Sequence, residues 1–189
     1  MLGHARQPAG ILRGMTTPLL TRLDARDRAL FDRWALGEQC THRSRRTWTA
    51  ITLLGGTVMT IAGSLLPALL ATGAWREGGR AALAILVSSH LLVQLVKRTV
   101  GRPRPSAGMS CAALVAEPDR FSFPSGHSAA AMSLAIGFGM AFPGITLAAC
   151  AVAAIVGFSR VALGVHYPGD VVAGQALAVI AAIGVAFVA

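Results

Sequence analysis

The sequence is poor in charged residues and poorest in acidic ones. Only 13% of its 189 residues are charged, and 8 Asp or Glu stand against 17 Lys or Arg. About 25% of residues are charged in a typical soluble domain. Hydrophobic residues make up 54% of the chain, and the mean hydropathy is +0.61. These values argue against a soluble domain and indicate one integral membrane domain.

Cysteine is scarce too, and its positions fit no metal motif. Cys40, Cys111 and Cys150 lie far apart in the sequence, so we expect no bound metal and no cofactor. No continuous apolar region with a cleavage site opens the chain, so we expect no signal peptide.

The net charge is +9, and nine arginines precede residue 47. Because no nucleic-acid-binding module is recognisable, we expect contact with anionic lipid and none with nucleic acid.

The N-terminal part differs in composition from the rest. Residues 1–16 are rich in Gly, Pro and Arg and are predicted to be disordered. From Thr17 to Gly37, apolar and charged residues alternate in a pattern typical of an amphipathic helix that lies in the membrane interface. We therefore expect a juxtamembrane part, 1–46, and a transmembrane domain, 47–189.

Five apolar runs follow, and we expect each to form a membrane-spanning helix. The first and longest is Trp48–Ala71; the others are Ala81–Val96 with its flanks, Ser128–Phe142, Ile145–Val165 and Val171–Ala189. A span needs roughly 20 apolar residues. Gly137 and Gly139 in the third run favour close helix packing. The expected fold is an all-α, multi-pass membrane bundle, with its oligomeric state left open.

Polar residues between the spans fall into three clusters. KRTVGRPRP (97–105) carries four cations, PSGH (124–127) precedes an apolar run, and SRVALGVHYPGD (159–170) holds Arg160, His166 and Asp170. Two spans separate loop 97–127 from loop 159–170, so both loops face one side of the membrane. Cations, a helix N-terminus and two histidines on one side suit phosphoryl transfer, in which negative charge spreads over oxygen atoms.

Each cluster also has a purely structural explanation. A basic loop can be a topology signal, Pro-Ser-Gly can cap a helix, and His166 with Asp170 can form a structural hydrogen bond. Arg160 is harder to explain in this way because an arginine within an apolar run is costly. His90 and Gln94 share a helical face with Lys97 and could support it, although a hydrogen-bonded core histidine is the expected role of His90.

The three clusters together resemble a known family. Lys97–Pro105 fits K-x6-R-P, Pro124–His127 is P-S-G-H, and Ser159–Asp170 fits S-R-x5-H-x3-D. In this order they look like the motifs of the type 2 phosphatidic acid phosphatase superfamily. That family includes membrane lipid phosphatases, undecaprenyl pyrophosphate phosphatases, soluble acid phosphatases and vanadium haloperoxidases. Its commoner membrane members have six spans, whereas this chain has an amphipathic stretch where a first span would lie.

The resemblance implies a role for each motif residue. His166 is expected as the nucleophile, Asp170 as the residue that orients it, and His127 as general acid and base. The implied phosphate ligands are Lys97, Arg104, Ser125, Gly126 and Arg160. The implied reaction is metal-independent hydrolysis of a lipid phosphate or pyrophosphate through a phosphohistidine.

The resemblance leaves the substrate open. The candidate substrates are phosphatidic acid, phosphatidylglycerol phosphate and isoprenyl phosphates or pyrophosphates. A phosphotransferase with the same site and a non-catalytic headgroup-binding protein are the alternatives. The short chain looks most like the small bacterial members of the family, which implies the bacterial inner membrane. The nine arginines before the first predicted span favour a cytoplasmic site.

Overall fold

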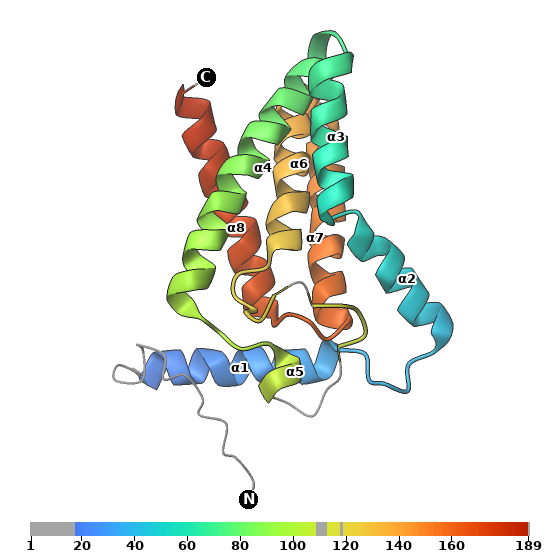
Figure 1. Ribbon diagram of the computed structural model, residues 1–189, viewed down its shortest axis with the longest axis vertical. Helices are drawn as coiled ribbons and strands as arrows, with labels where there is room; N and C mark the ends of the chain where they lie inside the picture. The colour runs from blue at the N-terminus through green and yellow to red at the C-terminus, as the bar shows by residue number, and fades with distance from the viewer. Residues whose placement is uncertain (1–17, 109–112, 118, 189) are drawn as a thin grey trace, which may run out of the picture.

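The computed structural model describes residues 18–108, 113–117 and 119–188 (Figure 1). Its elements are α1 (Pro18–Trp34), α2 (His42–Leu53), α3 (Thr57–Leu70), α4 (Gly73–Val100), α5 (Pro105–Gly108), α6 (Gly126–Ala141), the 3-10 turn η1 (Pro143–Ile145), α7 (Thr146–Ala162) and α8 (Pro168–Val188). An isolated bridge joins Pro103 to Phe121. The expected all-α class is confirmed, while the predicted disordered start, 1–16, lies outside the described residues.

Most of the predicted spans are long enough to cross a membrane. Four stretches meet the length and hydropathy needed, namely His42–Leu70, Gly73–Val100, Pro143–Ala162 and Pro168–Val188. They correspond to the first, second, fourth and fifth predicted spans. The third is α6, which has 16 residues and packs against α3, α4, α7 and α8. The chain is therefore a multi-pass membrane bundle with a short helix at its centre.

The first span differs from the prediction because it is broken. The apolar run predicts one helix from Trp48 to Ala71, whereas α2 ends at Leu53 and α3 begins at Thr57. Gly55 lies in this break, and glycine costs about 1 kcal/mol relative to alanine inside a helix. An added Cβ on Gly55 would lie 2.9 Å from the backbone oxygen of His127. The break thus lets the chain approach the start of α6 closely.

Small residues allow the helices to pack closely, as predicted for the third run. An added Cβ on Gly137 would collide with the backbone of Ala82 on α4. Ser89 on α4 and Ser133 on α6 share a buried hydrogen bond of 2.9 Å. Large apolar side chains instead face outward, among them Leu66, Leu69, Leu70, Leu91, Leu95, Leu147 and Val172. This distribution suits a bundle surrounded by lipid.

Helix α1 lies across one end of the bundle, roughly perpendicular to the other helices (Figure 1). This is the orientation expected of an amphipathic helix at a membrane interface. Phe31 is 1% exposed and packs edge-to-face against Tyr167, with ring centroids 5.4 Å apart. The N–H of Leu36 donates to the carbonyl of Ala162 at 2.8 Å. Helix α1 is therefore attached to the turn that joins α7 to α8.

Candidate active site

The three polar clusters meet at the end of the bundle that α1 covers (Figure 1). Helix α4 ends there at Val100, α6 begins there at Gly126, and a turn at 163–167 joins α7 to α8. The two polar loops thus lie at the same end, as the count of spans predicts.

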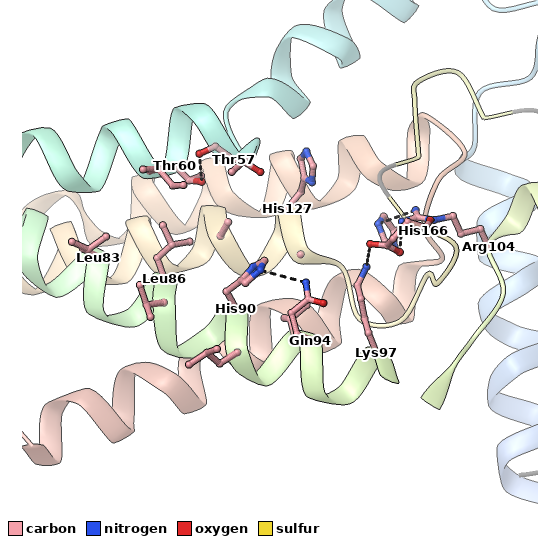
Figure 2. Close-up of a pocket in the computed structure, with 18 residues that line it drawn as sticks. Thr57, Thr60, Leu83, Leu86, His90, Gln94, Lys97, Arg104, His127 and His166 are labelled. Atoms are coloured by element: carbon pink, nitrogen blue, oxygen red, sulfur yellow. Dashed lines mark hydrogen bonds and ion pairs between the residues drawn. The ribbon is translucent and has the colours of Figure 1, made fainter. Parts of the chain in front are cut away.

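A cavity of about 630 Å³ begins at this end and continues between α3 and α4 (Figure 2). Its polar end is lined by Lys97, Arg104, Gly126, His127 and His166. Its other end is lined by Ile61, Leu83, Leu86, Val87 and Leu91. The cavity therefore joins a cationic, histidine-containing end to an apolar groove.

His166 lies in the turn between α7 and α8 and is 2% exposed. Its Nδ1 lies 3.5 Å from Oδ2 of Asp170, and its Nε2 lies 3.4 Å from Nη1 of Arg104. The carboxylate of Asp170 is fully buried and also accepts the N–H of Tyr167 at 2.8 Å. The imidazole thus has a carboxylate beside one nitrogen and a guanidinium beside the other.

The charge of His166 follows from its surroundings. Burial lowers the pKa of His166 to about 4; Asp170 acts to raise this pKa, and the cations Arg160 and Arg104 act to lower it. The ring is therefore uncharged at neutral pH. With its proton on Nδ1, towards Asp170, the ring keeps the lone pair of Nε2 facing the cavity.

Asp119 holds both cations at the cavity's polar end, and the motif pattern does not identify it. Its Oδ2 accepts from Nζ of Lys97 at 2.7 Å, and its Oδ1 accepts from Nη2 of Arg104 at 3.1 Å. Burial alone would raise the pKa of Asp119, but the hydrogen bond and charge of Lys97, with the charge of Arg104, hold this pKa below its ordinary value. A carboxylate therefore occupies the cations that a phosphate would need.

Helix α6 begins beside this cavity. Ser125 is its N-cap residue and is fully buried; its N–H donates to the carbonyl of Asp170, and its hydroxyl accepts from Ser128, both at 2.9 Å. Gly126 and His127 line the cavity in the first turn, where backbone N–H groups have no partner within the helix. A helix start of this kind favours an anion.

Arg160 is buried behind the cavity and is 2% exposed. Its Nη1 donates to the hydroxyl of Thr52 on α2 at 2.8 Å. Within the part of the chain that the structure describes, its Nε has no hydrogen-bond partner. A buried donor without an acceptor costs about 1–3 kcal/mol, so this nitrogen is an unsatisfied donor within the described residues.

Arg102 connects α1 to Asp170, the aspartate beside His166. The sequence shows Arg102 only as one of four cations in 97–105 and does not reveal this role. Its Nη1 lies 2.8 Å from Oδ1 of Asp170 and 2.6 Å from Oδ2 of Asp27, and its Nη2 lies 2.8 Å from Oδ1 of Asp24. The guanidinium carbon also lies 3.9 Å from the ring centroid of Tyr167. Two acidic residues of α1 thus share one arginine with Asp170. In the sequence, only the spacing of three residues between Asp24 and Asp27, which places them on one helical face, indicates that they could share a partner.

His90 is not the core residue that the sequence predicts. It is exposed and lines the cavity, and its Nε2 lies 3.3 Å from Nε2 of Gln94. The expected support of Lys97 by these residues is not what the structure shows, because Nζ of Lys97 binds Asp119 and the carbonyl of Phe121. A histidine on an apolar helix is buried only if that face meets another helix, and here it meets the cavity.

Known proteins resemble this chain over the region that holds the three motifs. The family model of the PAP2 superfamily matches residues 78–188, which include all three motifs. The lipid A 1-phosphatase of Rhizobium johnstonii is 42% identical over 96 residues, covering 48% of this chain and 39% of that protein. The decaprenylphosphoryl-5-phosphoribose phosphatase of Mycobacterium tuberculosis is 39% identical over 89 residues, covering 47% of this chain and 49% of that protein. The chain spans less than half the length of these curated relatives.

Solved structures share the fold over most of the chain. A transmembrane PAP2-type phosphatidylglycerolphosphate phosphatase from Bacillus subtilis has a TM-score of 0.65 and 27% identity, with 87% of this chain and 84% of that chain covered. Aquifex aeolicus LpxE has a TM-score of 0.68 and 22% identity, with 82% of this chain and 91% of that chain covered. At this level of identity the likeness shows the fold alone. Since the family model matches more than half of the chain and includes all three motifs, this protein belongs to the PAP2 superfamily.

Proposed function

We propose that this protein is a lipid phosphatase that hydrolyses a phosphate ester or pyrophosphate through a phosphohistidine on His166. The observation that carries the proposal is the placement of His166, whose Nδ1 faces Asp170 at 3.5 Å and whose Nε2 faces Arg104 at 3.4 Å in the cavity. The named phosphatases among its relatives support the reaction class.

In the first step, Nε2 of His166 attacks phosphorus and the bond from phosphorus to the leaving oxygen breaks. The Nδ1 proton stays directed at Asp170, which stabilises the positive charge that develops on the ring. His127 donates a proton to the leaving oxygen. Such general acid catalysis typically contributes about 10²–10⁴-fold to the rate.

In the second step, His127 takes a proton from water and the water oxygen attacks phosphorus. The bond between phosphorus and Nε2 breaks, which releases inorganic phosphate and restores neutral His166. In both steps Lys97, Arg104 and Arg160 bind the non-bridging oxygens. Ser125 and the N–H of Gly126 add donors at the start of α6, and each such donor is worth on the order of 10²–10³-fold in rate.

The apolar part of the cavity supports a lipid substrate. It lies between α3 and α4 and is lined by side chains such as Leu83, Leu86 and Leu91, while the cationic end lies at the end of the bundle (Figure 2). A phosphate at the cationic end leaves its attached chain inside the groove. The names of the relatives give lipid A and decaprenylphosphoryl-5-phosphoribose as substrates, and both are phosphorylated molecules with a lipid part, which agrees with this arrangement.

We test the function by phosphate release from a panel of lipid phosphates and pyrophosphates, with purified protein in detergent and EDTA present. The wild type is expected to release phosphate, and His166→Ala is expected to release none. His42→Ala is the matched control, because His42 is exposed on α2 and lies outside the cavity. A radiolabelled lipid should leave an acid-labile, alkali-stable label on the wild type but not on His166→Ala. Release that persists in His166→Ala would refute the proposal.

We further propose that the site faces the cytoplasm of a bacterial inner membrane. Residues 1–46 carry nine arginines and four acids, and α1, which belongs to this part, covers the site end of the bundle (Figure 1). Arg76, Glu77 and Arg80 lie instead at the start of α4, towards the other end. Cytoplasmic segments carry the excess of Lys and Arg. The test replaces Ala107, which is exposed, by cysteine in a chain whose three own cysteines are serines. Labelling by an impermeant reagent in intact spheroplasts would contradict a cytoplasmic site.

A further inference from the structure

One polar pair lies inside the groove and takes no part in the proposed chemistry. His90 and Gln94 face the cavity from α4 (Figure 2). The same helix lines this cavity with the apolar side chains of Leu86, Val87 and Leu91. Polar side chains are costly at membrane depth and usually mark a function. The pair is joined by a contact of 3.3 Å between Nε2 of Gln94 and Nε2 of His90.

Hydrogen-bond chemistry sets what the pair offers to a ligand. The amide nitrogen of Gln94 is a donor, so the Nε2 of His90 accepts and the ring carries its proton on Nδ1. The amide nitrogen has a second N–H, which remains for another acceptor. The groove wall therefore presents donors in a region where a hydrocarbon chain has no acceptor for them.

We infer that His90 and Gln94 form a subsite for an acyl carbonyl of the substrate, so that the enzyme favours acylated lipid phosphates over prenyl phosphates. The inference rests on the proposed function, since it assumes that a lipid phosphate binds in this cavity. A carbonyl oxygen accepts two hydrogen bonds and is uncharged, which suits a donor pair at this depth.

The spacing along α4 agrees with such a lipid. Gln94 and His90 precede Lys97 by three and seven residues, which corresponds to about 4.5 and 10.5 Å along the helix. In a glycerophospholipid, five covalent bonds join phosphorus to the nearest acyl carbonyl carbon, a distance of roughly 6 Å. With the phosphate at Lys97, this carbonyl lies at a depth between those of Gln94 and His90.

The test compares two lipids that differ only at the carbonyl. Dioleoyl phosphatidic acid has ester carbonyls, and its dialkyl ether analogue lacks them but keeps the phosphate and the chains. One hydrogen bond to a neutral acceptor predicts a kcat/KM about 2- to 12-fold higher for the diester with the wild type. Farnesyl phosphate, as the prenyl probe, should behave like the diether. In a sugar 1-phosphate with an acylamino group on the next carbon, five covalent bonds also join phosphorus to the carbonyl carbon. Its rate shows whether an amide carbonyl can bind the subsite in place of an ester carbonyl.

Two variants locate the effect. Gln94→Met and His90→Phe keep the size and apolar compatibility of the groove, and in both the preference for the diester over the diether should fall to about one. Thr57→Val is the matched control, because it removes a hydroxyl from the opposite wall of the same cavity and should keep the preference.

The outcomes separate this inference from the proposed function. Equal turnover of diester and diether by the wild type, or a preference that survives Gln94→Met and His90→Phe, overturns the inference and leaves the phosphatase intact. No turnover of any lipid by folded wild-type protein overturns the proposed function and the inference with it.

Discussion

The contact between α1 and Arg102 predicts that a charge outside the cavity controls the turnover rate. The perturbation is Asp27→Asn. Asn keeps an oxygen that accepts the N–H of Gly169, now 2.7 Å from Oδ1 of Asp27, but it loses the charge that faces Arg102 at 2.6 Å. The variant therefore isolates one interaction of Arg102, which in turn donates to Asp170 at 2.8 Å.

The magnitude follows from the loss of a hydrogen bond between charged groups. Because the single oxygen of Asn stays on the N–H of Gly169, its amide NH2 faces Arg102 and cannot accept, so a hydrogen bond worth about 1.5–3 kcal/mol is lost. The side chains of Asp27 and Arg102 are only 13% and 16% exposed, so solvent screens this pair little. If the full amount reaches the orientation of Asp170, kcat falls by about 12- to 160-fold. KM should change little because Asp27 does not line the cavity.

A double-mutant cycle with Arg102→Ala, measured as phosphate release from phosphatidic acid, checks the route of this effect. Asp27→Asn should lower kcat in the wild type and have almost no effect in the Arg102→Ala background. Asp32→Asn is the matched control, since Asp32 is an exposed carboxylate on the same helix. If the effects of Asp27→Asn and Arg102→Ala on kcat instead add to within about 0.5 kcal/mol, Asp27 does not act through Arg102 and the reasoning is refuted.

Three more predictions concern the cavity itself. Asp119→Asn should lower the KM for a lipid phosphate by about 5- to 12-fold, because the phosphate no longer displaces a carboxylate from Lys97 and Arg104; a higher KM would mean that Asp119 positions these cations instead. The pKa of His166, about 4, predicts that kcat/KM falls as the pH drops below about 5, since protonation removes the nucleophilic lone pair; an acid limb near pH 6.5 would contradict this assignment. Gly55→Ala should lower kcat and the midpoint of thermal unfolding, because its Cβ would lie 2.9 Å from the backbone oxygen of His127; unchanged values for both would show that the α2–α3 break adjusts freely.

Local patterns were sufficient to predict the helices because a membrane restricts what a chain can do. Backbone groups in lipid must be hydrogen-bonded within their own segment, so long apolar runs become helices. The run from Trp48 to Ala71 is the exception, since it breaks where Gly55 meets the start of α6. Hydropathy does not detect such a break, because Gly55 and Gly56 change the mean hydropathy of the run very little. The helix that Gly55 approaches, α6, is also distant in the sequence.

The candidate site was predictable in part for a related reason. Counting spans places two loops at the same end of a bundle without any knowledge of packing, and motif spacing selects residues such as Lys97 and His166 within them. Five of the eight predicted residues line the cavity, while Asp170, Ser125 and Arg160 lie buried beside it. Asp119 could not be selected, because its role depends on a loop folding back onto two cations.

Hydropathy and the spacing of residues along a helix are local properties. They were therefore enough to predict a membrane bundle, polar loops that share one end, and the motif residues that meet there. The folded bundle was needed to show that Asp24 and Asp27 of α1 reach Arg102 and, through it, Asp170, and that His90 faces a cavity rather than a neighbouring helix. These contacts join segments more than 60 residues apart or depend on the space between helices. Such contacts arise from the packing of the whole bundle, and no periodicity in the chain records them.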